Sequence, residues 1–291
     1  MTMTIARPEV QKTIDVSAYA PAKPVVHHEP LKIAEDTYLI RDTFNEGKAP
    51  IFAYVNSMVI TGTEPIIVDT GTVANRENWL NDVFSLVDPR DVRWIFISHD
   101  DHDHVGNLPE ALALCPNATL VSSWFQAERL AGDLTMPLDR LMWVDDGGSF
   151  DAGDRVFAAI RPPLFDSPTT RGLYDPKTGV YWGADAFATP VSVAMDDVSG
   201  LHPEEWRQGY SMFNIGNSPW LEIVDAVKFN KTVQRVAGLR PKVIASAHTP
   251  VILGPYVNTA LDMTFNLPGQ PLPVFPGQAD LEAIRAQLIH G

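Results

Sequence analysis

The sequence contains a single cysteine and few basic residues, and these scarcities exclude several classes of protein. With only Cys115 among 291 residues, no disulfide can form within the chain, which favours a reducing compartment. No base lies near Cys115 in the sequence, so we expect a buried structural thiol rather than a nucleophile. Basic residues number 22 against 36 acidic ones, which gives a net charge of −14. Nucleic acids and anionic membranes require a basic face, so neither is an expected partner.

Long apolar runs and nucleotide-binding motifs are also absent. No stretch approaches the length of a membrane span, and residues 1–30 lack the apolar core of a signal peptide. The chain contains neither G-x-G-x-x-G nor a Walker loop. We therefore expect a soluble, cytoplasmic protein.

The order of apolar segments predicts an α/β fold with irregular ends. Residues 1–30 contain four prolines and are expected to form an extended arm, because proline interrupts regular structure. From residue 31 to 260, segments typical of strands alternate with helical segments, including a long amphipathic helix over 220–238. Residues 261–291 predict a proline-rich tail that ends in a short helix. Proline should keep the arm and tail out of the sheets, against the core or a second subunit of a homo-oligomer.

The densest polar cluster follows a segment that predicts a buried strand. In "SHDDHDHVGN", residues 98–107, three histidines and three aspartates occupy positions 99–104. On an extended segment alternate side chains point the same way, so His99, Asp101 and Asp103 are expected to share one side. His104 follows where the chain turns toward a glycine. The spacing predicts that these four residues bind metal.

At these residues the sequence resembles the metallo-β-lactamase superfamily. The family motif His-x-His-x-Asp-His, followed by glycine, matches "HDDHDHVG" from His99 apart from its second histidine. Other landmarks follow the family order: "VDTG" at 68–71, "WGADAF" at 182–187 and "ASAHTPV" at 245–251. The resemblance covers about residues 31–255 and implies an αββα sandwich of two mixed sheets with helices outside. It further implies Asp185 as the carboxylate that bridges two metals and His248 as the last histidine ligand.

Two departures from the family motif bear on the metal. Asp101 stands where many members carry histidine, and a carboxylate there resembles the flavodiiron and oxygen-binding diiron branch. The histidine expected in the second half is missing from "RPPLFDSPTTRG", where Asp166 is the nearest residue able to bind metal. Alternatively, Phe165 occupies that position and leaves one metal with an open site. The resulting metal ligands are His99, Asp101, Asp103, His104, Asp166, Asp185 and His248, of which Asp103 and Asp185 are also the predicted catalytic residues.

This ligand set is rich in oxygen and has no thiolate, which favours iron. Hard carboxylates suit iron or manganese, whereas zinc hydrolases prefer nitrogen-rich sites. We expect two iron ions, with manganese or zinc as substitutes, in a protein that binds or reduces oxygen or a related small oxidant. The chain ends at Gly291, soon after the metal domain and without the flavodoxin domain of flavodiiron proteins, so a separate electron-donor protein is an expected partner.

Two other functions stay open from the sequence. A bimetallic centre also generates hydroxide near neutral pH, so a hydrolase of an ester, thioester, lactone or similar substrate is the main alternative. The third is a binding module with a degenerate metal site. The redox function requires iron and oxygen, whereas hydrolysis proceeds with zinc or manganese and without oxygen.

Overall fold

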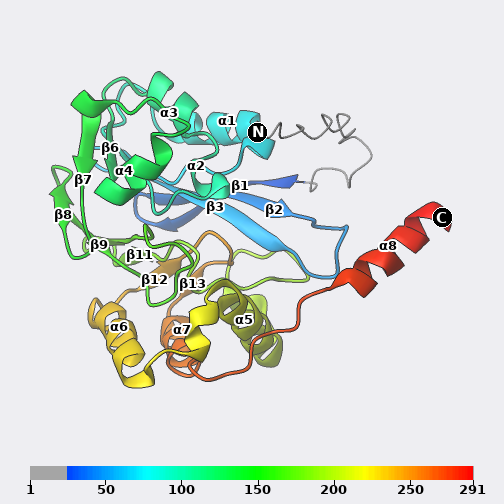
Figure 1. Ribbon diagram of the computed structural model, residues 1–291. Helices are drawn as coiled ribbons and strands as arrows, with labels where there is room; N and C mark the ends of the chain where they lie inside the picture. Colours follow the sequence, from blue (N-terminus) through cyan, green and yellow to red (C-terminus); the bar gives the residue numbers. More distant parts are fainter. Residues whose placement is uncertain (1–24, 291) are drawn as a thin grey trace, which may run out of the picture.

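The computed structural model describes residues 25–290, which place two β-sheets face to face between two layers of helices (Figure 1). The first sheet contains, in spatial order, β1 (Val25–Ala34), β2 (Thr37–Phe44), β3 (Ala53–Ile60), β4 (Ile66–Val68), β5 (Trp94–Phe96), β6 (Thr119–Ser122) and β7 (Leu141–Trp143). The second contains β13 (Ile252–Leu253), β12 (Val243–Ala245), β11 (Val180–Trp182), β10 (Gly172–Asp175), β9 (Val156–Ile160) and β8 (Ser149–Asp151). Both sheets mix parallel with antiparallel pairs, as predicted.

The helices lie on the outer faces of the two sheets. The first sheet is covered by α1 (Arg76–Leu86), α2 (His102–Val105), α3 (Leu108–Leu114) and α4 (Trp124–Leu130). The second sheet is covered by α5 (Pro203–Asn217), α6 (Ala226–Gly238) and α7 (Pro255–Phe265), and α8 (Gln278–His290) extends away from the body. The predicted αββα sandwich is thus confirmed. None of the helices within residues 25–290 is both long and apolar enough to cross a membrane.

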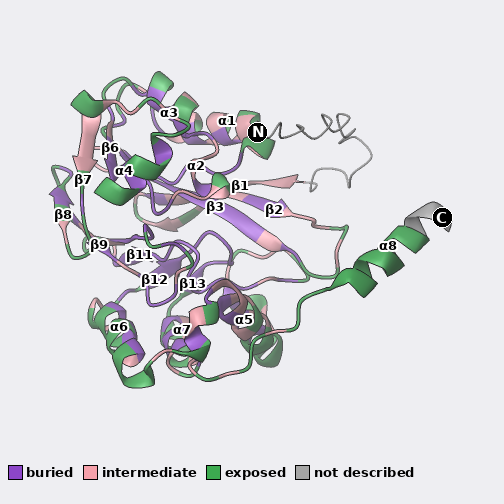
Figure 2. Cartoon of the chain, in the orientation of Figure 1, coloured by how far each residue is buried: buried purple, intermediate pink, exposed green. Residues whose placement is uncertain are grey.

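Alternation along the strands builds the three apolar layers. In β4, Ile66 and Val68 face the space between the sheets, whereas Ile67 packs with the outer helices. In β11, Trp182 faces the inner layer and Tyr181 packs with the helices of the other side. Successive strand side chains point to opposite faces, so strands buried on both faces are apolar throughout. Figure 2 shows this burial along the central strands.

Polar residues follow the carboxyl ends of four central strands. β4 pairs in parallel with β5, and β11 pairs in parallel with β12. Parallel strands end on the same edge of a sheet, so the segments that carry Asp69, His99, Asp185 and His248 meet at one end of the sandwich.

Residues 25–30 belong to β1, which corrects the expectation that prolines exclude this segment from the sheets. β1 lies at the edge and pairs only with β2. The register shifts between His28 and Leu31, so Pro30 lies at an irregularity of an edge strand, where no ladder bond is lost. The rest of the expected arm, residues 1–24, lies outside the described residues.

Two helix boundaries differ from the sequence pattern. The helix expected over 220–238 begins only at Ala226, because the Asp225 side chain accepts hydrogen bonds from the backbone of Val227 and Lys228 and so caps the helix there. α7 crosses the boundary expected at residue 260, since Pro255 starts a helix that continues to Phe265. The predicted C-terminal helix is α8.

Candidate metal centre

The seven predicted ligand residues lie together at the strand ends, in two groups with one residue between them. The first group is His99, Asp101 and Asp166, and the second is Asp103, His104 and His248. Within each group, one donor atom of every residue lies within 4.8 Å of the others. Asp103 and His104 are adjacent in the sequence, whereas Asp166 and His248 come from the second half of the chain. Segments from both sheets therefore form the groups.

Asp185 lies between the two groups. Its Oδ2 is 3.6 Å from His99 Nε2, in the first group. Its Oδ1 is 2.9 Å from His104 Nε2 and 3.2 Å from His248 Nε2, in the second. The two oxygens of one carboxylate therefore face different groups, which is the placement that a bridge between two ions requires.

The segment after β5 divides its ligands by changing from extended to helical backbone. Asp101 has extended dihedrals and precedes the short helix α2, which begins at His102. The helical turn directs Asp103 and His104 to the second group, while His99 and Asp101 remain in the first. The expected common side for His99, Asp101 and Asp103 is thus wrong in detail, because strand alternation ends where the helix starts.

The backbone on either side of Asp185 adopts a conformation that non-glycine residues rarely occupy. Ala184 and Phe187 have φ values of 52° and 68°, in the left-handed region that non-glycine residues rarely occupy. Each such residue costs on the order of 1 kcal/mol or more. The surrounding contacts hold this turn, since Ser246 Oγ and the Ala247 backbone N–H both donate to the carbonyl oxygen of Ala184.

Although His104 Nε2 lies 2.9 Å from Asp185 Oδ1, three buried atoms at the shared position make no hydrogen bond of acceptable geometry within the described part of the chain. They are His99 Nε2, His104 Nε2 and Asp185 Oδ1. A buried polar atom without a partner costs about 1–3 kcal/mol, so such atoms require an explanation. A metal pair would supply their partners, and three imidazoles with four carboxylates form a donor set that suits iron. The residues present therefore fit a dinuclear centre.

The other ring nitrogen of each histidine is held from outside the centre. His104 Nδ1 lies 2.8 Å from Asp69 Oδ2, and His248 Nδ1 lies 2.7 Å from the carbonyl oxygen of Tyr54. A carbonyl oxygen only accepts, so a neutral His248 carries its proton on Nδ1 and keeps the Nε2 lone pair for a metal. The carboxylate of Asp69 has the same effect on His104.

Asp69 is a positioning residue that the sequence interpretation missed. Its carboxylate accepts hydrogen bonds from the Ser98 backbone N–H at 2.6 Å, Ser98 Oγ at 2.7 Å and Trp182 Nε1 at 3.0 Å, besides its contact with His104. Ser98 Oγ also lies 3.2 Å from His99 Nδ1. Asp69 thus links both sheets to two candidate ligands. The "VDTG" landmark was the available signal, but it did not reveal this role.

Asp166, rather than Phe165, joins the first group. Phe165 packs against Trp220 with ring centroids 5.0 Å apart, and its carbonyl oxygen accepts from Trp220 Nε1 at 2.8 Å. Asp166 is exposed at the rim. One of its carboxylate oxygens nevertheless lies among the donors of His99 and Asp101, where partial burial and the charge of Asp185 raise the pKa of Asp166 above its usual value.

Opposite charges outweigh burial inside the centre. Burial raises the pKa of Asp185, but the three neighbouring histidines lower it well below its ordinary value. Burial lowers the pKa of His248, but Asp185 and Asp103 raise it to about 9. Without metal, the positive charge of the imidazolium groups therefore compensates the negative charge of the carboxylates. Metal ions would supply this positive charge instead.

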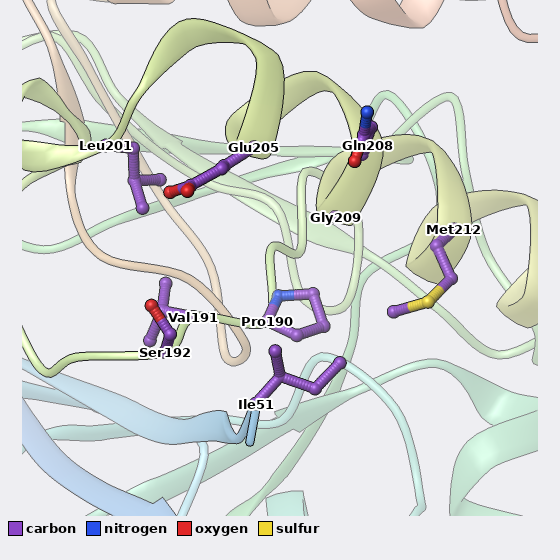
Figure 3. A pocket seen from close by; sticks show the side chains of 9 residues that line it. All are labelled: Ile51, Pro190, Val191, Ser192, Leu201, Glu205, Gln208, Gly209 and Met212. Atoms are coloured by element: carbon purple, nitrogen blue, oxygen red, sulfur yellow. The ribbon is translucent and has the colours of Figure 1, made fainter.

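Helix α5 supplies two further residues beside the ligands that the sequence did not indicate. Asn217 Nδ2 lies 3.4 Å from Asp185 Oδ2, and the ring of Phe213 lies 5.5 Å from that of His248. The same helix borders a cavity of about 420 Å³, where Met212 points toward Ile51 (Figure 3). α5 therefore forms one wall of the centre and of its surroundings.

Comparison with known proteins agrees with this architecture. The family model described as ODP family beta lactamase matches residues 52–249. The putative diflavin flavoprotein A 1 of Nostoc sp. is 26% identical over 217 residues, which cover 71% of this chain and 36% of that protein. The nitric oxide reductase of Moorella thermoacetica is 23% identical over 188 residues, which cover 62% of this chain and 47% of that protein. This chain thus spans less than half the length of these two curated relatives.

Solved structures share the fold at low sequence identity. The rubredoxin oxygen:oxidoreductase of Desulfovibrio gigas superposes with a TM-score of 0.71 at 16% identity, over 81% of this chain and 61% of that one. A structure titled as the peroxy diiron species of the chemotaxis sensor ODP gives 0.62 at 19% identity, over 89% of this chain and 99% of that one. At these identities the likeness establishes the common sandwich.

Proposed function

The chain belongs to the ODP family of beta-lactamase proteins, and on that premise we propose that it is a diiron protein that binds or reduces oxygen or a related small oxidant. The observation that carries the proposal is the position of Asp185, whose two oxygens face two groups of mixed imidazole and carboxylate donors. Oxygen-rich donors favour iron over zinc. Reduction requires electrons, so the proposal includes a separate electron-donor protein.

Each candidate ligand has a place in this proposal. His99, Asp101 and Asp166 would hold one ion, Asp103, His104 and His248 the other, and Asp185 would serve both. Two ferrous ions held by these residues would supply the two electrons that reduction of a small oxidant needs. Asp69 and the Tyr54 carbonyl oxygen direct the Nε2 lone pairs of two histidines inward, and the four carboxylates favour a higher oxidation state through their charge.

The names of the similar proteins support this class of substrate. One relative is named a nitric oxide reductase, and one similar structure is named an oxygen oxidoreductase. We further propose a cytoplasmic location, which suits a chain with one cysteine and a centre that requires electrons.

Asp101→His tests the proposal at the position that departs from the wider superfamily. The change replaces a hard anionic ligand with neutral imidazole, so we expect preference to shift from iron toward zinc. Protein loaded anaerobically with ferrous iron should change its absorbance when air is admitted, and the variant should change much less. Asp91→His, the same substitution at an exposed aspartate, should behave like the original protein.

A hydrolytic centre would give a different and equally clear result. If the ferrous protein ignores oxygen and nitric oxide while its zinc or manganese form hydrolyses an ester, thioester or lactone, the centre is hydrolytic. Metal analysis of both forms separates this result from simple loss of iron.

A further inference from the structure

The first ligand group comes from two separate loops. His99 and Asp101 follow β5, whereas Asp166 lies in the loop between β9 and β10. The side chain of Asp101 is 47% exposed and Asp166 is exposed at the rim, so neighbouring side chains surround only part of either carboxylate. The separation of these ligands therefore depends on how the two loops are held against each other.

Two contacts join the loops. The Arg171 backbone N–H donates to the carbonyl oxygen of Ser98 at 2.7 Å. Two residues further along each loop, in opposite directions, Thr169 Oγ1 donates to Asp100 Oδ1 at 2.6 Å. The loops therefore run antiparallel. A single contact would leave one loop free to pivot, whereas two contacts define both the separation and the direction of the loops.

The carboxylate of Asp100 is held through both of its oxygens. Asp100 lies between two ligands in the sequence, but its side chain contacts Thr169 and Arg129. Arg129 belongs to α4, and its Nε donates to Asp100 Oδ2. The Asp100 side chain is only 7% exposed. Hydrogen bonds between charged groups are strong, so this carboxylate has one defined orientation.

Two hydroxyl groups extend this contact to the residue beside Asp166. A carboxylate oxygen only accepts, so the Thr169 hydroxyl directs its proton at Asp100. The Ser167 hydroxyl lies 2.8 Å from Thr169 Oγ1 and is therefore the donor in that contact. Both hydroxyl residues are buried. The chain Ser167–Thr169–Asp100 thus connects the neighbour of one ligand to the residue between the other two.

The second ligand group is held by different contacts. Asp69 holds Nδ1 of His104, and the carbonyl oxygen of Tyr54 holds Nδ1 of His248. Neither contact involves the loop that carries Thr169. A change in the hydroxyl chain should therefore act on the first group.

We propose that Thr169 and Asp100 are positioning residues that hold Asp166 against the other two ligands of the first group and so determine the affinity of that group for its ion. The inference rests on the proposed dinuclear centre. Residues that contact no metal then control the occupancy of one of the two positions, and reduction of an oxidant by two electrons requires both.

Thr169→Val removes the hydroxyl group but keeps the shape and the charge of the site. A change in metal binding therefore reports geometry rather than the electrostatic field. Thr169→Ser keeps the hydroxyl and should restore binding. Thr178→Val is the matched control, because Thr178 Oγ1 donates to Asp175 Oδ2 at 2.7 Å at the opposite end of the sandwich. This control loses the same kind of hydrogen bond away from the centre.

Titration with cobalt in competition with a chromophoric chelator measures the affinity for each ion without oxygen chemistry. The original protein should bind two ions. Thr169→Val should bind one of them unchanged and the other about tenfold more weakly, as is usual when a contact behind a metal ligand is lost. Arg129→Met, at an exposed position where folding is not at risk, should weaken the same ion. Thr169→Ser and Thr178→Val should match the original protein.

Proton NMR of the cobalt form identifies the weakened ion. Ring N–H protons of imidazoles that bind cobalt are strongly shifted, and the second group has two such rings whereas the first has only His99. With one equivalent of cobalt, Thr169→Val should show the signals of His104 and His248 without that of His99.

Three results would contradict the positioning role. Two ions bound equally well by the original protein, Thr169→Val and Arg129→Met would overturn it alone, as would equal weakening of both ions or the same loss in Thr178→Val. Fewer than two ions in the original protein would overturn the dinuclear centre together with the inference. The two failures are therefore distinguishable.

Discussion

Side chains at the centre either direct free donor atoms inward or hold the donors in place. His104 is a donor, because its Nε2 faces Asp185. Asp69 is a positioning residue, because its carboxylate holds Nδ1 of the same ring. A change in a donor should alter how many ions bind, whereas a change in a positioning residue should alter how tightly they bind. Two substitutions separate these effects.

Asp185→Asn should reduce bound iron from two ions per chain toward one. The amide keeps the shape of the carboxylate but replaces one oxygen with an NH₂ group, which cannot bind a metal. Elemental analysis after anaerobic loading measures the stoichiometry. Asp196→Asn, the same change at an exposed carboxylate, should retain two ions. Full occupancy in Asp185→Asn would place the bridge elsewhere.

Asp69→Asn should weaken metal binding by about 10–100-fold, the usual effect of losing a carboxylate that orients a histidine ligand. All four groups around Asp69 can donate hydrogen bonds, so the NH₂ of asparagine must face a donor. Competition with a chromophoric chelator measures the affinity. Ser98→Ala, which leaves the Asp69–His104 contact in place, should have a smaller effect. Equal affinity in both variants would show that His104 is oriented without Asp69.

At the scale of elements, polar contacts between a helix and a strand determine how the two lie relative to each other, which the pattern of apolar residues does not specify. β2 is joined to the start of α1 by Asp42, whose side chain accepts a hydrogen bond from Asn75. His27 of the edge strand β1 lies 3.6 Å from the same carboxylate. Asp42 is almost fully buried, so its charge is costly and the junction should respond to pH.

Asp42→Asn should remove a loss of stability that occurs between about pH 4 and pH 6. Burial raises the pKa of Asp42 from 3.8 to about 6, against the opposing effects of Asn75 and His27. The folded protein therefore binds this proton more tightly than the unfolded chain, and the associated stability is lost as pH rises through the folded pKa. The shift corresponds to roughly 3 kcal/mol.

Urea unfolding at several pH values measures this difference. At pH 7 the asparagine variant should be the more stable protein, since its amide still accepts from Asn75 without a buried charge. Near pH 4 the two free energies of unfolding should converge. A constant difference from pH 4 to pH 7 would show that Asp42 does not titrate in this range.

For the whole molecule, the two sheets are joined by ionic contacts at both ends of the sandwich. The candidate metal centre lies at one end. At the other, Arg155 of the β8–β9 turn donates to Asp175 at the end of β10 and to Asp36 of the β1–β2 turn. The Arg155 side chain is 1% exposed and that of Asp175 is 2% exposed. This contact connects the first sheet to the second.

Arg155→Met should lower the free energy of unfolding by about 3–5 kcal/mol, because it leaves the buried carboxylate of Asp175 without its partner. Arg155→Lys keeps the charge and should lose less. Burial raises the pKa of Asp36. The hydrogen bond and charge of Arg155, together with the charge of Lys177, outweigh burial and hold this pKa below its usual value. The stability from this pair is therefore present above pH 3.8 and lost as pH falls through the lower folded pKa.

Chemical denaturation across the acidic range tests both parts of this prediction. The gap between the original protein and Arg155→Met should be widest near neutral pH and should narrow below pH 3.8. A gap of less than 1 kcal/mol at neutral pH would mean that the apolar layers alone hold the sheets together.

The sequence by itself determined the features that depend on local spacing and strand alternation. Short apolar segments placed most strands, and the cluster at 99–104 identified four candidate ligands. The resemblance placed Asp185 and His248 as well, because their motifs follow strands in the family order. The metal-binding roles and the function assigned to these residues stay predictions until metal loading tests them.

Only the tertiary structure decided which atoms face each other across the sheets. Asp69 contacts Trp182, Asn217 contacts Asp185, and Thr169 contacts Asp100. Each pair comes from segments far apart in the chain, so no periodicity connects them. Pro30 in the edge strand β1 depends likewise on which strand has a free edge. Spacing fixes side chains within one element, whereas distances between elements follow from how the layers pack.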